Sequence, residues 1–204
     1  TEPYEPFHGI RFWEEFGPNA LVMKIRAESM RDLGACLSPN NAFLILQGLE
    51  TLSMRMQQHV ANTRALIDWL QQHEQVVWVN HPDLEDHPSN PIARQLFPEG
   101  AGSILCFGVV GGRAGGAAFI DALQLASNLA NVGDSRTLVL HPGSTTHSRL
   151  TADAMAAAGI SEDMIRVSVG LENIQDIKND FALGLKVAKK LITTQTGHQP
   201  EVAQ

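Results

Sequence analysis

The chain has 204 residues, a mass of 22.2 kDa and a formal net charge of −7 at pH 7. Its 44% hydrophobic composition excludes wholesale disorder, and its acidic balance argues against a nucleic-acid-binding or acidic-membrane-binding surface. Cys36 and Cys106 form no CxxC motif and no apolar run approaches the ~20 residues of a membrane span, so we expect a cytoplasmic protein with reduced thiols and no membrane partner.

The N-terminal stretch, TEPYEPFHG, is polar and begins without a methionine, as expected of a segment cut from a larger polypeptide. A helix is predicted from Pro18 to Asp32, because proline suits the first turn and Gly34 stands just past the end.

The pair Ser38-Pro39 predicts a second helix start, with serine as the N-cap. Apolar residues then recur at helical spacing, which predicts one long helix over residues 40–72, bent near Gly48. A helix of this length commonly bridges two structural layers.

From residue 73 onwards short strands alternate with helices, which predicts an α/β fold with one small sheet covered by helices on one face. Residues after Thr193 are polar, and we expect 194–204 to be a flexible tail. The expected strands are 76–79, 102–110, 137–140 and one around Arg166; the expected helices are 117–125, 152–158 and 174–192; residues 82–91 are expected to form a loop.

The glycine-rich segment GVVGGRAGG follows the second expected strand and has a spacing that partly matches a phosphate-binding loop. Gly111 and Gly116 have four residues between them, but Ala117 stands where a P-loop requires lysine. A strand-to-helix turn is the better interpretation.

His141 and His147 are separated by a Pro-Gly loop, without an adjoining acidic or thiol partner, so we expect no metal site there. The hydroxyls of Ser144, Thr145 and Thr146 are expected to satisfy turn backbone. No nucleophile motif such as GxSxG is present.

Arg166 lies inside a β-branched strand in which Ile165, Val167 and Val169 share one face. A guanidinium on a rigid strand can bind a carboxylate through two parallel hydrogen bonds. An exposed arginine on an edge strand fits the pattern equally well. Asn131, in Asn-Val-Gly-Asp, is by itself a typical turn residue.

Four blocks of the sequence resemble the cystathionine/methionine family of pyridoxal-phosphate (PLP) enzymes, most closely its O-acetylhomoserine sulfhydrylase branch. ANVGD, in place of SLGD or SLGG, favours that branch, and the resemblance extends to about Leu191. The blocks are HGIRFWEEFGPNA, RDLGACLSPNNAFLILQGLETLSMRMQQHVAN, NLANVGDSRTLVLHPGSTTH and IRVSVGLENIQDI.

The resemblance implies the C-terminal part of a fold type I PLP-dependent transferase. Residues 1–72 would be the remnant of the large PLP domain and the interdomain helix, and residues 73–193 the small C-terminal domain. The family implies a homotetramer of two catalytic dimers.

The resemblance also implies the site. Arg166 matches the arginine that binds the substrate α-carboxylate, Asn131 falls beside that carboxylate, and Thr146 matches a pocket threonine. Gly143 departs from the more usual alanine and loosens the loop backbone.

The Schiff-base lysine of the family has no counterpart in this chain, nor do its phosphate-binding glycine, ring-stacking tyrosine and pyridinium-binding aspartate. The lysines all resemble solvated helix charges: Lys24, Lys178, Lys186, Lys189 and Lys190. The resemblance therefore implies that PLP is bound mainly by a missing N-terminal half and that the segment alone is inactive.

The implied activity is conversion of O-acetylhomoserine and sulfide, or another thiol, to homocysteine and acetate. A methionine γ-lyase or a cystathionine γ-synthase or γ-lyase is the alternative within the family. A non-catalytic binding or assembly module is the alternative from another class.

Overall fold

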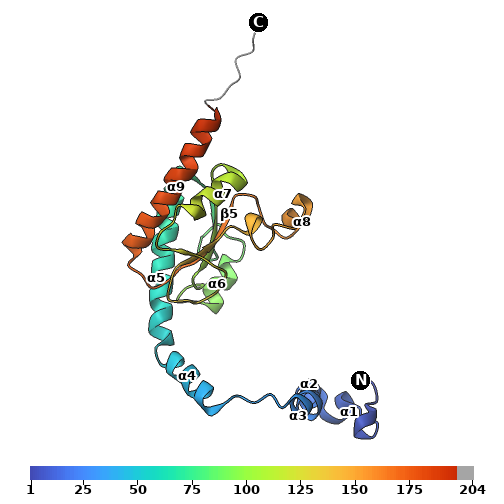
Figure 1. Ribbon diagram of the computed structural model, residues 1–204. Coiled ribbons are helices and arrows are strands. Elements are labelled where there is room, and N and C mark those ends of the chain that lie inside the picture. Colours follow the sequence, from blue (N-terminus) through green and yellow to red (C-terminus); the bar gives the residue numbers. More distant parts are fainter. Residues whose placement is uncertain (197–204) are drawn as a thin grey trace. The chain divides into compact units, whose positions relative to one another are not determined.

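The structure, a computed structural model, describes residues 1–196 (Figure 1). Its chain forms two compact units, Thr1–Thr51 and Leu52–Gln204. No helix among the described residues has both the length and the apolar character needed to cross a membrane.

The first unit consists of short helical segments. Phe12 is its buried hydrophobic side chain, 7% exposed, and lies among the rings of Tyr4, Phe7 and Phe16. The segments are η1 (Glu5–Phe7), α1 (Phe12–Phe16), η2 (Gly17–Asn19), α2 (Ala20–Lys24), η3 (Ile25–Met30), α3 (Arg31–Leu33) and α4 (Pro39–Glu50).

The first predicted helix is confirmed, as α2, η3 and α3 follow one another without interruption. The middle segment, η3, is π-helical. Gly34 ends the run with a φ of 65°, a left-handed conformation that glycine adopts without steric cost.

The prediction of one helix over residues 40–72 is wrong, because α4 ends at Glu50 and a separate helix, α5, covers Leu52–Gln71. Thr51 interrupts the helix with φ −106° and ψ 5°, whereas Gly48 stays helical. The predicted cap is confirmed, since the Ser38 hydroxyl accepts a 3.2 Å hydrogen bond from the Asn41 amide.

The second unit is built on a five-stranded sheet in the order β1-β2-β5-β4-β3. Only the β3–β4 pair is parallel, while β1–β2, β2–β5 and β5–β4 are antiparallel. The strands are β1 (Val76–Asn80), β2 (Ile104–Val109), β3 (Ser127–Asn128), β4 (Leu138–Leu140) and β5 (Met164–Ser168).

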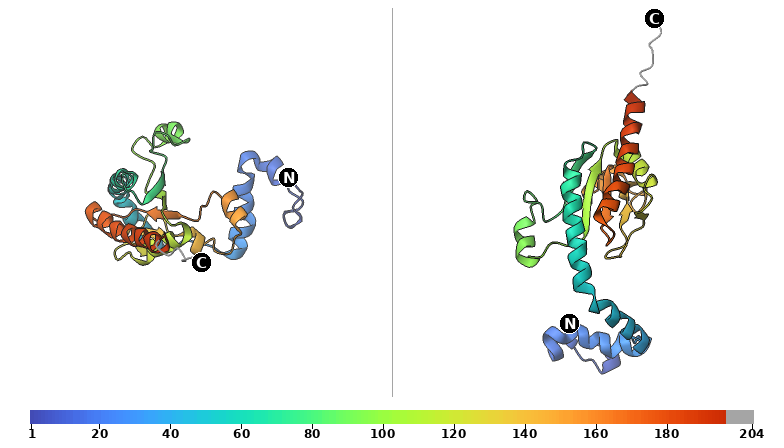
Figure 2. Two further views of the ribbon diagram at one scale, coloured as in Figure 1. Left: turned by 90° about the horizontal axis from the view of Figure 1, so that it is seen from above. Right: turned by 90° about the vertical axis from the view of Figure 1, so that its left-hand side faces the viewer.

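Three helices, α5, α7 (Gly112–Asp121) and α9 (Ile174–Thr196), cover one face of this sheet, as predicted. Figures 1 and 2 show α9 running alongside α5. Phe107, Phe119 and Phe181 are fully buried between them, with ring centroids 5.4–6.2 Å apart. Apolar burial of this kind is the main driving force for the fold.

Two shorter helices, α6 (Asn90–Leu96) and α8 (Ala152–Ala157), and the turn η4 (Pro142–Ser144) complete the second unit. The predicted loop over 82–91 is wrong at its end, because α6 begins at Asn90. The two-residue strand β3 was not predicted.

The helix predicted to start at residue 117 begins at Gly112, so most of the glycine-rich segment is helical rather than a turn. Close packing explains the glycines. A Cβ on Gly116 would lie 2.6 Å from the His141 ring, and one on Gly115 would collide with the Val110 carbonyl.

The compact units divide at Thr51 rather than at residue 72, because α5 buries six residues in the second unit. The assignment of residues 1–72 to a cofactor domain and its connecting helix stays a prediction. Residues 194–196 belong to α9 instead of a tail, and 197–204 lie outside the described residues.

Candidate functional site

Arg166 lies on β5, the central strand of the sheet, which rules out an edge-strand position. Ile165, Val167 and Val169 are fully buried in the helix-covered core, as the alternation predicts. Arg166 therefore points to the other face, where its cross-strand partners are Cys106 on β2 and Leu140 on β4.

The Arg166 guanidinium makes no hydrogen bond or ion pair within residues 1–196, and the residue is partly buried. Its charge acts on Cys106: burial raises the pKa of that thiol, and Arg166 partly opposes the rise. A guanidinium that is held on a strand and has no partner among the described residues can receive a carboxylate in a bidentate pair.

Asn131 and Thr146 belong to the loops that follow β3 and β4, two parallel strands that end at the same edge of the sheet. The Leu129 amide donates a hydrogen bond to the Val139 carbonyl, so β3 ends beside the end of β4. Asn131 follows two residues after Leu129. Thr146 follows β4 through η4, and Leu140, the last residue of β4, is opposite Arg166.

These loop side chains are exposed and make local contacts only. Asn131 Oδ1 accepts a 2.9 Å hydrogen bond from the Val132 amide. Thr146 Oγ1 lies 2.8 Å from His147 Nδ1. Among the described residues, no hydrogen bond or ion pair joins either side chain to Arg166.

The Asn131 loop is held by the following turn. Asp134 accepts hydrogen bonds from the backbone amide of Arg136, at 3.0 Å, and from its guanidinium. The amide hydrogen bond is the main reason that the pKa of Asp134 is lowered. The ionised carboxylate of Asp134 therefore fixes the turn between Asn131 and β4.

His141 anchors the Thr146 loop, a role that was not predicted. Its ring is buried, with Nε2 2.8 Å from the Glu162 carbonyl and Nδ1 2.8 Å from Ser144 Oγ. Because a carbonyl only accepts, Nε2 carries the proton and Nδ1 accepts from Ser144. Both ring nitrogens are thus occupied by hydrogen bonds within the chain.

A buried polar network fixes the chain just after β5. His59 Nδ1 donates to the Val169 carbonyl at 2.6 Å, and Asn62 donates to the carbonyls of Gly170 and Glu172 at 3.0 and 2.9 Å. Glu172 in turn accepts from the Thr137 amide and hydroxyl. These contacts attach the end of β5 to α5 and β4 and keep Arg166 in register.

A scan against family models matches residues 17–186 to the Cys/Met metabolism PLP-dependent enzymes. The chain belongs to this family. The resemblance seen in the sequence is therefore confirmed.

The curated relatives are sulfhydrylases and homocysteine synthases. O-acetyl-L-homoserine sulfhydrylase 1 of Thermus thermophilus is 47% identical over 181 residues, 89% of this chain and 43% of the relative. Homocysteine synthase of Schizosaccharomyces pombe is 46% identical over 188 residues, 92% of this chain and 44% of the relative. This chain thus spans less than half the length of these relatives.

Solved structures support the fold type I assignment. A putative O-acetylhomoserine (thiol)-lyase from Campylobacter jejuni, which carries N'-pyridoxyl-lysine-5'-monophosphate, gives a TM-score of 0.79 at 33% identity, covering 91% of this chain and 44% of that one. Cystathionine gamma synthase from Xanthomonas oryzae gives 0.71 at 38% identity, covering 78% and 41%.

The described residues do not fit covalent attachment of PLP. A Schiff-base lysine is typically activated by burial or by a neighbouring cation. Lys24 instead pairs with Glu28 at 2.6 Å, and Lys189 pairs with Glu74 at 3.2 Å on the exposed side of α9. The cation that could pair with a carboxylate is instead Arg166 on β5.

Proposed function

We propose that the chain is the C-terminal portion of a PLP-dependent O-acetylhomoserine sulfhydrylase. The whole enzyme would convert O-acetylhomoserine and sulfide to homocysteine and acetate. The names of the most similar curated relatives support this reaction. The observation in this chain that supports the proposal is Arg166, which lies on the central strand β5 and has no partner among the described residues.

In this proposal Arg166 binds the α-carboxylate of the amino-acid substrate through two parallel hydrogen bonds. Asn131 and Thr146 line the same pocket from the two loops at that end of the sheet. The segment therefore orients the substrate, and the cofactor supplies the electron sink.

The rest of the enzyme completes the site. PLP would be bound mainly by the part of the relatives' length that this chain does not span, and this chain alone would be inactive. We further propose a cytoplasmic homotetramer that acts on small-molecule substrates and binds no nucleic acid.

A chimera tests the proposal. The segment of the Thermus thermophilus relative that matches this chain is replaced by this chain, and homocysteine formation from O-acetylhomoserine and sulfide is measured. We expect activity that falls sharply in Arg166→Gln and is unchanged in Arg113→Gln, a half-exposed arginine that pairs with Glu162 at 3.5 Å. Equal activity of the two variants would contradict the site.

A cystathionine γ-synthase is the second candidate, because the Xanthomonas oryzae synthase is as similar as the solved sulfhydrylase of Wolinella succinogenes, at 38% and 37% identity. The chimera distinguishes them when sulfide and cysteine compete as sulfur donors. Dominant cystathionine formation would favour the synthase.

A further inference from the structure

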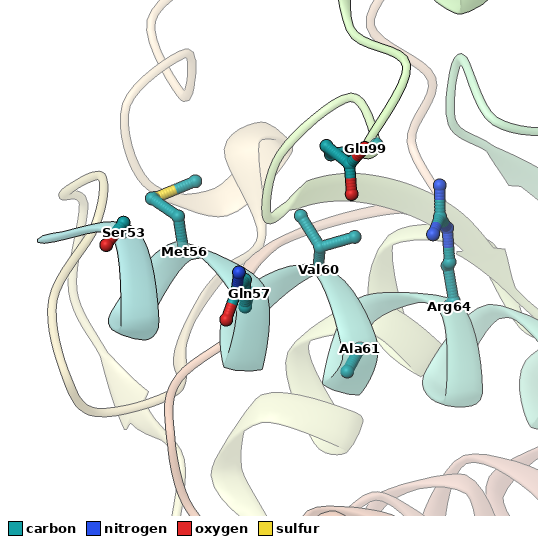
Figure 3. A pocket seen from close by; sticks show the side chains of 8 residues that line it. Ser53, Met56, Gln57, Val60, Ala61, Arg64 and Glu99 are labelled. Atoms are coloured by element: carbon teal, nitrogen blue, oxygen red, sulfur yellow. The ribbon is translucent and has the colours of Figure 1, made fainter.

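A pocket lies on the side of α5 that faces the loop after α6, and its lining includes none of the residues assigned to the substrate site (Figure 3). Its volume, about 430 Å³, is in the range of small-molecule sites. Six α5 residues from Ser53 to Arg64 lie on one helix face, at positions i, i+3, i+4, i+7, i+8 and i+11, and form one wall; Glu99 and Gly100 form the other.

The two walls are tied together by Asp83. One carboxylate oxygen accepts a 2.9 Å hydrogen bond from Arg64 Nε on α5, and the other accepts a 3.0 Å bond from the Ala101 amide on the loop. Asp83 is only 19% exposed. The pocket is therefore held open by a specific bridge between helix and loop.

Gly100 closes the contact between these walls. Its φ is +130°, and a Cβ there would lie 2.5 Å from Val60 Cγ1 and 3.0 Å from Arg64 Nη2. Only glycine allows the loop to approach α5 this closely. The same contact places the loop beside the terminal nitrogens of Arg64.

Arg64 is paired with Asp83, and Glu99 stands on the opposite wall of the pocket. Asp83 uses the Nε of Arg64, which leaves the outward nitrogens available. Within residues 1–196 the Glu99 carboxylate has no hydrogen bond or ion pair, and so it is not paired with Arg64. Met56 and Val60 project from α5 on the same side as Arg64, towards the loop that carries Glu99 (Figure 3).

We propose that this pocket binds a zwitterionic α-amino acid with an unbranched apolar side chain. Arg64 would hold its carboxylate, Glu99 its ammonium group, and Met56 and Val60 its side chain. Each charge would gain a charge-assisted hydrogen bond, and the flexible thioether of Met56 can adapt to the ligand. The site is separate from Arg166 and does not depend on the proposed reaction.

Isothermal titration calorimetry of the chain with L-norleucine tests the proposal. Hexanoate lacks the ammonium group and pentylamine lacks the carboxylate, so we expect each to bind at least about tenfold more weakly than norleucine. Absence of saturable norleucine binding, or equal binding of hexanoate or pentylamine, would overturn the proposal.

Variants locate the site. Arg64→Gln should weaken norleucine binding about tenfold or more, whereas Arg94→Gln, which removes a similarly exposed and ion-paired arginine, should not. Ala61→Phe fills the pocket from an exposed position, and Ala114→Phe is its control on α7. Because Arg64 also holds Asp83, Ala61→Phe keeps the test valid if Arg64→Gln disturbs the loop.

Arg166→Gln separates the two amino-acid sites. Norleucine binding that survives this change and is lost in Ala61→Phe supports the α5 pocket, even if the proposed reaction is wrong. Binding that is lost in Arg166→Gln and kept in Ala61→Phe would place the ligand on β5 and overturn the proposal.

Discussion

The pairing of β5 with β2 and β4 holds Arg166 in place, because its side chain has no hydrogen-bond or ion-pair partner among the described residues. In the chimera, Arg166→Lys keeps the charge but removes the planar fork, so at best one hydrogen bond to the carboxylate remains. Hydrogen bonds to charged groups contribute roughly 1.5–3 kcal/mol, and we expect kcat/KM for O-acetylhomoserine to fall about ten- to hundredfold. Steady-state kinetics beside Arg113→Lys measures this, and wild-type kinetics would refute the carboxylate role.

His81 makes stability depend on pH. Burial lowers the pKa of this histidine below its ordinary value of 6.5, and the Asp83 carboxylate only partly opposes this. The unfolded chain therefore binds more protons than the folded one just below that value. The stabilisation is complete above pH 6.5 and is lost as the pH falls through the lowered folded pKa.

His81→Asn removes the titrating ring and keeps an acceptor for the Asp83 amide, which lies 3.1 Å from His81 Nδ1. We expect the free energy of unfolding to fall less between pH 7.5 and pH 5 than in the wild type, as measured with urea. Burial also lowers the pKa of His73, so some pH dependence should remain. An unchanged slope would show that His81 protonates freely in the fold.

Much of the fold could be predicted element by element, because the alternation of apolar and polar residues and the helix caps depend only on neighbouring residues. The buried face of β5, the start of α4 at Ser38 and the end of α3 at Gly34 follow from neighbouring residues. The glycine-rich start of α7 could not be predicted in this way, because its glycines are explained by His141 and Val110, which pack against them. Glycine is otherwise a poor helix former.

Part of the site was predictable for the same reason. The face on which Arg166 lies could be predicted from its neighbours, and its role came from family resemblance. The supports of the site could not: His59 contacts Val169 across 110 residues, and Thr137 contacts Glu172 across 35. Such contacts depend on tertiary packing, which leaves no periodic pattern in the sequence.

The packing of α7 on α9 depends on a glycine whose role is steric. Gly→Ala inside a helix normally stabilises by up to about 1 kcal/mol. At Gly184 the new Cβ would lie 2.5 Å from Phe119 Cδ2 and 2.9 Å from the Phe119 carbonyl oxygen. We therefore expect Gly184→Ala to destabilise by about 1–3 kcal/mol in denaturant unfolding.

Gly48→Ala is the matched control, because a Cβ on this α4 glycine meets nothing within 4 Å. It should be neutral or stabilising. If Gly184→Ala behaves like Gly48→Ala, α9 is free to move away from α7, and the tight packing of these helices is wrong.

At the scale of the whole molecule, α4 exposes apolar side chains within the unit Thr1–Thr51. Phe43, Leu44, Ile45, Leu46 and Leu49 occupy all sides of this helix and are 53–59% exposed. A helix that is apolar on all sides is normally buried. In the proposed enzyme, other parts of the same chain or of neighbouring subunits would cover it.

On its own, the chain should therefore self-associate through α4, because contiguous exposed apolar surface drives association. The double variant Phe43→Gln, Leu46→Gln keeps good helix formers and should shift sedimentation towards monomer. Ile92→Gln, Leu96→Gln on α6 removes two similarly exposed side chains, 50% and 60%, and should leave association unchanged. A stable wild-type monomer at high concentration would mean that the segment is an autonomous domain, which would favour a binding module over part of a larger enzyme.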